Sequence, residues 1–245
     1  MILGVYAKKC DQTSGFGGTR QTSQHKTYWF VRRLDDDTYE IQPLNNNHLP
    51  SGVTATVSKR ILMTEYVPEV DYYERRTLPV LQSLQRKLDR GEELFHAKEL
   101  AASEAEFVKI LYLDAQNPQA NLRLGDIYCQ KKDYQRLKKV LGRILNNDRV
   151  FAEGERHRFN EFGVNLRKGG HLIEALEYYS KAIAINAEDE HLHFNVARVF
   201  WEMNEKTDCR KHLETALRIN PAFEEAQTFL IFCRKHLDAD TAASA

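Results

Sequence analysis

The stretch "FGVNLRKGGHLIEALEYYSKAIAIN" runs from Phe162 to Asn186 and decides how the chain folds. It predicts two helices that are interrupted at Gly169 and Gly170. Gly163 lies inside the first of these helices, where glycine costs about 1 kcal/mol relative to alanine. Small residues at helical spacing let another backbone come close, so the fold depends on whether this arrangement recurs along the chain.

The arrangement does recur, at nearly constant spacing. Gly91, Gly125, Gly163 and Ala197 follow one another in steps of 34, 38 and 34 residues. Three further columns keep the same steps: Ser103, Leu137, Ala175 and Cys209; Phe107, Leu141, Tyr179 and Leu213; and Ile110, Ile144, Ala182 and Ala216. A fixed period of this length predicts stacked helix pairs. The longer middle step predicts an insertion of about four residues near residues 148–155.

The motifs inside these columns resemble the tetratricopeptide repeat (TPR) family, whose unit follows the pattern W-x2-L-G-x2-Y…A-x3-F…P. "LRLGDIY" supplies Leu124, Gly125 and Tyr128, and the next unit supplies Phe159, Phe162, Gly163, Leu166, Ala175, Tyr179 and Ala182. The resemblance covers roughly residues 84–237. It implies four helix pairs followed by a lone final helix over 222–237, which should turn its apolar side toward the array.

Residues 1 to about 75 instead have the residue patterns that are typical of β-strands. Short alternating or β-branched segments predict about five strands, near the start at residues 2–7 and then at 26–34, 38–44, 53–58 and 60–68. The polar, Gly-rich segment 10–26 is expected to be a loop. A small meander or an SH3-like barrel is the expected form.

The predicted fold class is therefore α+β, with three parts. A small N-terminal β domain covers residues 1–75, and an all-α TPR-like superhelix covers 76–237. The stretch "EVDYYERRTLP" (69–79) is expected to be a short connector, and residues 238–245 a flexible tail.

Composition limits the classes of partner and compartment. The formal net charge is zero, which argues against a nucleic-acid partner, and no apolar run reaches the roughly 20 residues that span a bilayer. The first residues do not form a secretory signal. Cys10, Cys129, Cys209 and Cys233 form no C-x-x-C, so reduced thiols in a cytoplasmic protein are expected.

No motif predicts catalysis, a cofactor or a metal. "SGFGGTR" (14–20) lacks the spacing of a phosphate-binding loop. Nothing local joins His25 or His48 to Cys10 as a nucleophile pair. His191 and His193 are two residues apart, so they face different sides of a helix. The chain is expected not to be an enzyme.

The resemblance implies that the first helix of each pair lines a concave groove, which such arrays use for binding. The residues that this places in the groove of the third and fourth units are His157, Asn160, Val164, Arg167, Lys168, His191, Phe194, Arg198 and Trp201. Aromatic and arginine residues are common anchors at interfaces. Ordinary packing between repeats is the alternative explanation for Trp201.

One use of the family is a Lys, Asn and Arg clamp for the C-terminal carboxylate of heat-shock chaperones. Leu88 and Glu92, or Leu122 and Asp126, occupy the sites of its first pair, so no such clamp is expected. The expected function is a non-enzymatic scaffold that binds a peptide segment of another protein. Two alternatives remain: a regulatory module whose β domain binds a small anionic ligand or a second partner, and a homo-oligomer formed through the repeats.

Overall fold

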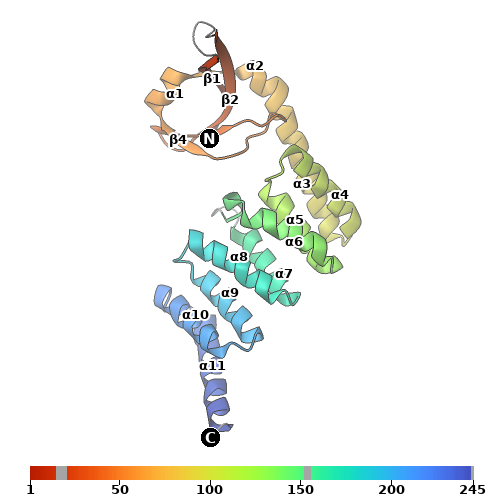
Figure 1. The fold of residues 1–245 in the computed structure, drawn as a ribbon, viewed down its shortest axis with the longest axis vertical. Helices are drawn as coiled ribbons and strands as arrows, with labels where there is room; N and C mark the ends of the chain where they lie inside the picture. The colour runs from red at the N-terminus through yellow and green to blue at the C-terminus, as the bar shows by residue number, and fades with distance from the viewer. Residues whose placement is uncertain (15–20, 152–155, 244–245) are drawn as a thin grey trace. The chain divides into compact units, whose positions relative to one another are not determined.

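The computed structural model describes residues 1–14, 21–151 and 156–243, with side chains described outside 10–25, 152–157 and 237–243. The chain divides into two compact units, Met1–Gln116 and Asn117–Ala245. The first contains an antiparallel sheet, short helices and one long helix pair, and the second contains the later helices (Figure 1). The α+β class is confirmed, while the predicted boundaries at 75/76 and 237/238 stay a prediction.

The sheet of the first unit is a meander whose last strand returns to the first. Its strands are β1 (Ile2–Ser14), β2 (Gln21–Arg33), β3 (Thr38–Pro43), β4 (Ala55–Ser58) and β5 (Tyr66–Pro68). They lie in the order β4-β3-β2-β1-β5, and each neighbouring pair is antiparallel. Tyr39 and Ile41 of β3 are buried with Val31, Leu62 and Tyr66 in the core of this unit.

Two predicted boundaries in the sheet are wrong. The segment 60–68 was expected to be a strand, but α1 (Lys59–Glu65) is a helix and only Tyr66–Pro68 is a strand. Ser58 caps this helix, because its side chain accepts a hydrogen bond from the backbone N–H of Ile61. The strand expected over 53–58 begins at Ala55, and Val53 is exposed.

The predicted loop over 10–26 is also wrong across most of its length. β1 and β2 stay paired from Cys10 opposite His25 to Ser14 opposite Gln21. A polar composition on both faces hid these strands, because the prediction relied on alternation between apolar and polar residues. Residues 15–20 lie outside the described residues.

The segment expected to be a connector is helical. It forms α2 (Val70–Tyr72) and a π-helical turn, η2 (Tyr73–Thr77), which leads directly into α3 (Leu78–His96). Pro79 has no N–H to donate one turn back. At the preceding residue, the N–H of Leu78 donates to the carbonyl of Tyr73, five residues earlier, which is the hydrogen bond of a π-turn.

Four helix pairs and a final helix follow, as the repeat predicts. The pairs are α3 with α4 (Leu100–Leu113), α5 (Pro118–Lys131) with α6 (Tyr134–Leu145), α7 (Arg156–Lys168) with α8 (Leu172–Ile185), and α9 (Glu190–Glu202) with α10 (Lys206–Ile219); α11 (Glu224–Ala243) ends the array (Figure 1). Residues 114–117 and 186–189 connect successive pairs, and 220–223 connect the last pair to α11, whereas 146–155 is longer and contains the 3-10 turn η3 (Asp148–Phe151). The predicted insertion is therefore at this connection.

The glycine column explains how the helices approach each other. A Cβ on Gly91 would lie 2.8 Å from the ring of Phe107, and one on Gly163 would lie 2.5 Å from the ring of Tyr179. Both rings come from the second helix of the same pair. At Gly125 the space is filled by Phe162 of α7, because Leu141 stands in its pair where the other two have a ring. The glycines thus allow a ring to contact the backbone of the first helix.

The final helix covers the end of the array. Phe223, which directly precedes α11, and Ala226, Leu230 and Cys233 of α11 are buried against Ala197 of α9 and against Cys209, Leu213 and Ala216 of α10. Phe229 packs on the same cluster and is partly buried. The predicted apolar side of this helix is confirmed.

The contact at Gly163 generates a testable prediction. Gly163→Ala should lower the free energy of unfolding by about 1–3 kcal/mol, because the new methyl group would overlap Tyr179. Gly142→Ala is the matched control: Gly142 is an exposed residue of α6, and a Cβ there meets nothing within 4 Å. That control should raise stability by up to about 1 kcal/mol. Urea unfolding measures both, and equal effects of the two substitutions would contradict the role of the contact.

Candidate protein-interaction site

The residues that the sequence placed in the groove come from two helices of the second unit. α7 carries five of them, His157, Asn160, Val164, Arg167 and Lys168, and α9 carries the other four, His191, Phe194, Arg198 and Trp201. Asn160 and Val164 are half-buried, and Lys168 is exposed. The side chain of His157 lies outside the described residues. The ring of His191 is exposed and packs edge-on against Phe223, with the centroids 4.8 Å apart.

Two guanidinium groups and one carboxylate influence one another among these residues. Arg167 is 6% exposed and donates a hydrogen bond from Nη1 to Glu202 Oε1. Burial lowers the pKa of Arg198, the positive charge of Arg167 lowers it further, and Glu202 acts in the opposite direction. The group therefore has two cations and one anion in a partly desolvated place. We call Arg167, Arg198 and Glu202 the arginine cluster.

A buried phenol lies behind the arginine cluster. A Cβ on Gly163, one turn before Arg167, would lie 2.5 Å from the hydroxyl of Tyr179. Burial raises the pKa of Tyr179, and the charges of Arg167 and Arg198 oppose that rise, so both guanidinium groups lie near the ring. Among the described residues, neither the Tyr179 hydroxyl nor Arg167 Nε has a hydrogen-bond partner. The cluster thus has buried polar atoms whose hydrogen-bonding capacity is not used.

Aromatic side chains flank Arg198 on α9. The Arg198 guanidinium lies 5.8 Å from the ring centroid of Phe194, within cation–π range. Trp201 packs on the final helix, with centroids 5.8 Å from Phe229 and 5.1 Å from Phe232. Packing therefore accounts for part of the Trp201 surface, as the alternative explanation held, and the indole is still half-buried rather than enclosed.

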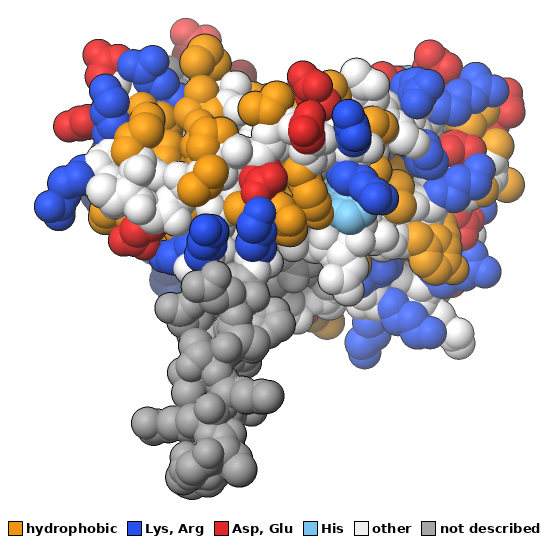
Figure 2. All heavy atoms as spheres, turned by 90° about the horizontal axis from the view of Figure 1, so that it is seen from above, with side chains coloured by type: hydrophobic (Ala, Val, Ile, Leu, Met, Phe, Trp, Pro, Cys, Tyr) orange, Lys and Arg blue, Asp and Glu red, His pale blue; other side chains and the backbone are white. Residues whose placement is uncertain are grey.

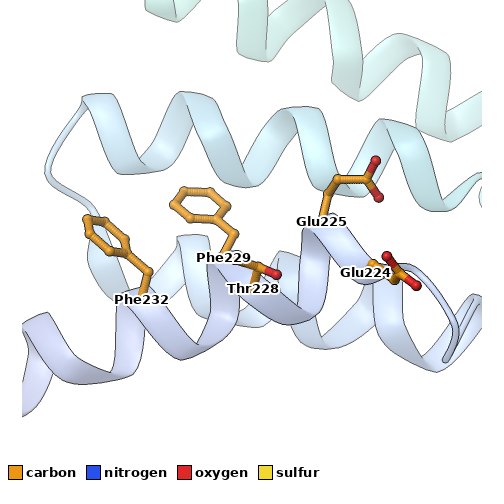
Figure 3. A pocket seen from close by; sticks show the side chains of 5 residues that line it. All are labelled: Glu224, Glu225, Thr228, Phe229 and Phe232. Carbon is orange, nitrogen blue, oxygen red and sulfur yellow. The ribbon is translucent and has the colours of Figure 1, made fainter.

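The final helix adds a part of the site that the sequence did not reveal. A hollow of about 510 Å³ is lined by Glu224, Glu225, Thr228, Phe229 and Phe232 (Figure 3). Figure 3 shows the rings of Phe229 and Phe232 on the same side of α11, while the two glutamates lie toward its N-terminal end. Phe232 is 43% exposed, so part of its ring is open to solvent. We call Phe194, Arg198, Trp201, Phe229 and Phe232 the α9–α11 surface.

A second hollow lies in the first unit. Its volume is about 420 Å³, and Lys26, Tyr28, His48 and Tyr72 are among its lining residues. The rings of Tyr28 and Tyr72 are stacked with their centroids 4.0 Å apart, and His48 Nδ1 lies 2.8 Å from the Tyr72 hydroxyl. Lys26 pairs with Glu69 at 2.9 Å. Residues from β2, the loop after β3 and α2 therefore meet here.

Histidines and cysteines form pairs rather than larger groups. Among the described residues, no three His, Cys, Asp or Glu side chains are placed to hold one metal ion. Cys209 Sγ and Cys233 Sγ lie 3.5 Å apart in the core as free thiols. His193 Nδ1 lies 3.1 Å from His212 Nδ1, and His193 Nε2 lies 3.3 Å from the carbonyl of Ala187. The carbonyl requires a proton on His193 Nε2, so His212 is the donor between the two rings.

The surface is mixed in charge. On the face that Figure 2 displays, Lys and Arg side chains are interspersed with Asp and Glu side chains. Within the described part of the chain, no helix combines the length and apolar character needed to cross a membrane.

Comparison with known proteins gives a likeness of structure alone. No protein-family model and no curated protein matches the sequence. Among solved structures, PilF of Pseudomonas aeruginosa aligns with a TM-score of 0.49 and 14% identity, over 64% of this chain and 70% of PilF. MamA from Desulfovibrio magneticus RS-1 aligns with a TM-score of 0.47 and 13% identity, over 66% and 89%.

A chain of the Cut9–Hcn1 hetero-tetramer of the APC/C aligns with a TM-score of 0.45 and 16% identity, over 61% of this chain and 29% of that one. All three are proteins with TPR helices. The description of this chain as TPR-like rests on its own columns and helix contacts.

The histidine pair generates a prediction about pH. Burial lowers the pKa of His212 below its ordinary value near 6.5, His193 and Lys211 lower it further, and Asp208 opposes them. The unfolded chain therefore binds a proton first as the pH falls. The stability that is present above about pH 6.5 should decrease toward pH 5, by at most about 1.4 kcal/mol per pH unit from this group.

His212→Gln should flatten this part of the curve of unfolding free energy against pH. His96→Gln, which removes an exposed imidazole from the first unit, is the matched control. A His212→Gln curve parallel to the wild-type curve between pH 7 and pH 5.5 would show that the pair does not control stability.

Proposed function

We propose that the chain is a protein-interaction scaffold that holds a segment of another protein on the α9–α11 surface. The observation that supports this most strongly is the arrangement of Arg198 between Phe194 and Trp201 on one face of α9, next to the exposed ring of Phe232. Arginine and large aromatic residues are enriched among the side chains that dominate binding energy. Lys168, Asn160, Val164, His157 and His191 are the proposed flanking residues.

The site is suited to binding because its rings are already held in place. Trp201 is fixed by Phe229, Phe232 and His236, whose centroids lie 5.1–5.8 Å from its own. A side chain that is ordered before binding loses little rotamer freedom on binding. The proposal assigns binding and no reaction to this surface. The proposed setting is the cytoplasm, where the buried thiols of Cys209 and Cys233 would stay reduced.

An affinity capture with matched variants tests the proposal. Arg198→Glu combined with Trp201→Ala should remove the bound partner, because loss of an anchor of this kind typically costs 2 kcal/mol or more, about thirtyfold in affinity. Capture from native lysate followed by mass spectrometry measures the difference from wild type. The variant must melt at a temperature close to that of wild type.

The matched control is Arg143→Glu combined with Tyr134→Ala on α6. It makes the same charge change and removes an aromatic ring from exposed positions. A partner that is lost equally from both double variants, or retained by both, would count against the α9–α11 surface. Light scattering over a dilution series decides whether the captured partner is a second copy of the chain.

The hollow of the first unit favours a second candidate function, the binding of a small anionic ligand. An anion could compete with Glu69 for Lys26 and lie against the Tyr28–Tyr72 stack. ATP and inorganic phosphate are suitable probes. A ligand present at a hundredfold excess over its Kd should stabilise the protein by about 2.7 kcal/mol, and Lys26→Met should abolish the rise in melting temperature. An unchanged melting temperature with both probes would remove this candidate.

A further inference from the structure

The arginine cluster has one positive charge more than its own carboxylate balances. Arg167 is nearly enclosed and its Nε–H has no partner among the described residues, although a buried guanidinium normally uses its donors. Glu202 accepts from Arg167, which is buried, whereas Arg198 is partly exposed and is the more accessible cation of the two. A second carboxylate would complete the cluster, and hydrogen bonds between charged groups are the stronger ones.

The position of Arg198 says what kind of carboxylate fits. Phe194 is four residues before it and Trp201 is three residues after it, so all three lie along one face of α9. A rise of 1.5 Å per residue puts the two aromatic residues roughly 4.5–6 Å from Arg198 along the axis. In an extended peptide, residues i and i+2 point to the same side and lie roughly 6.6 Å apart. Phe194 and Trp201 offer apolar contacts on both sides of Arg198. They therefore favour the carboxylate of an internal Asp or Glu, which has peptide neighbours on both sides, over a C-terminal carboxylate.

Resting on the proposed function, we infer that the α9–α11 surface selects an extended segment in which an Asp or Glu side chain lies between two apolar residues, each two positions away. The acidic side chain pairs with Arg198 in front of Arg167. The apolar side chains lie against Phe194 and against Trp201 with Phe232. The pattern reads the same in both chain directions, so it does not depend on the polarity of the bound segment.

Selection from a library of random peptides of about twelve residues, displayed with no free C-terminus, tests the inference. The full-length protein is used, with Trp201→Ala and Arg198→Gln in parallel. Wild type should enrich the apolar-x-acidic-x-apolar pattern, and Trp201→Ala should enrich none of these peptides. Arg198→Gln should retain apolar enrichment and lose the preference for Asp and Glu.

Synthetic peptides then measure the charge pair itself. A selected peptide with an amidated C-terminus should bind wild type at least tenfold more tightly than its twin in which the acid is replaced by the matching amide. On Arg198→Gln the two peptides should bind within about threefold of each other. Arg210→Gln on α10 is the matched control and should keep the wild-type discrimination.

The outcomes separate this inference from the proposal on which it rests. Peptides that need Trp201 but show no preference for an acid would overturn the inference alone. A selected peptide that binds when synthesised with a free C-terminal carboxylate, but not when amidated, would also overturn it. Failure to select any peptide, or equal binding to Trp201→Ala, would instead overturn the proposed function.

Discussion

The close approach of one aromatic ring to a glycine backbone is the constraint on which the helical part depends. Phe107, Phe162 and Tyr179 each occupy the volume in which a Cβ would stand on Gly91, Gly125 or Gly163. A ring in that position excludes water from the helix interface and fixes the distance between the axes, because packed interiors tolerate few voids. Each glycine loses helix propensity, and the burial of a large ring offsets that cost.

The exception at Gly125 links the second and third helix pairs. Leu141 stands in the column where the first and third pairs have a ring, and Phe162 of α7 fills the space. The contact therefore runs between α5 and α7 and not within one pair. α7 also carries Gly163, and α9 accepts the Arg167 side chain through Glu202. The same helix that locks the two pairs together thus places the arginine cluster.

The sequence alone predicted the helix pairs because the columns record contacts that recur. It did not reveal a fifth column of left-handed turn residues: Lys98, Lys132, Gly170 and Asn204 have positive φ and follow the first helix of each pair. Only one of the four is glycine, so the amino-acid composition did not indicate the turn.

The strand predicted over 60–68 was wrong for residues 60–65, because Ile61 and Thr64 favour strands while the Ser58 cap favours a helix. Arg198 and Trp201 were predicted for the site, but the contacts of Phe232 and Glu202 depend on packing between helices.

The final helix covers the apolar end of the array, but it also exposes apolar side chains of its own. As the end of the array it covers Ala197, Cys209 and Leu213, and an end helix usually presents polar residues to solvent. α11 does so at Glu224, Glu225 and Thr228, and yet it leaves Phe232 and Ile231 exposed. Exposed apolar rings lose the stabilisation of about 25 cal/mol per Å² that burial would give. Phe232 is only partly covered by Trp201. A partner that covers the rings of Phe232 and Trp201 would therefore gain the remaining free energy of burial.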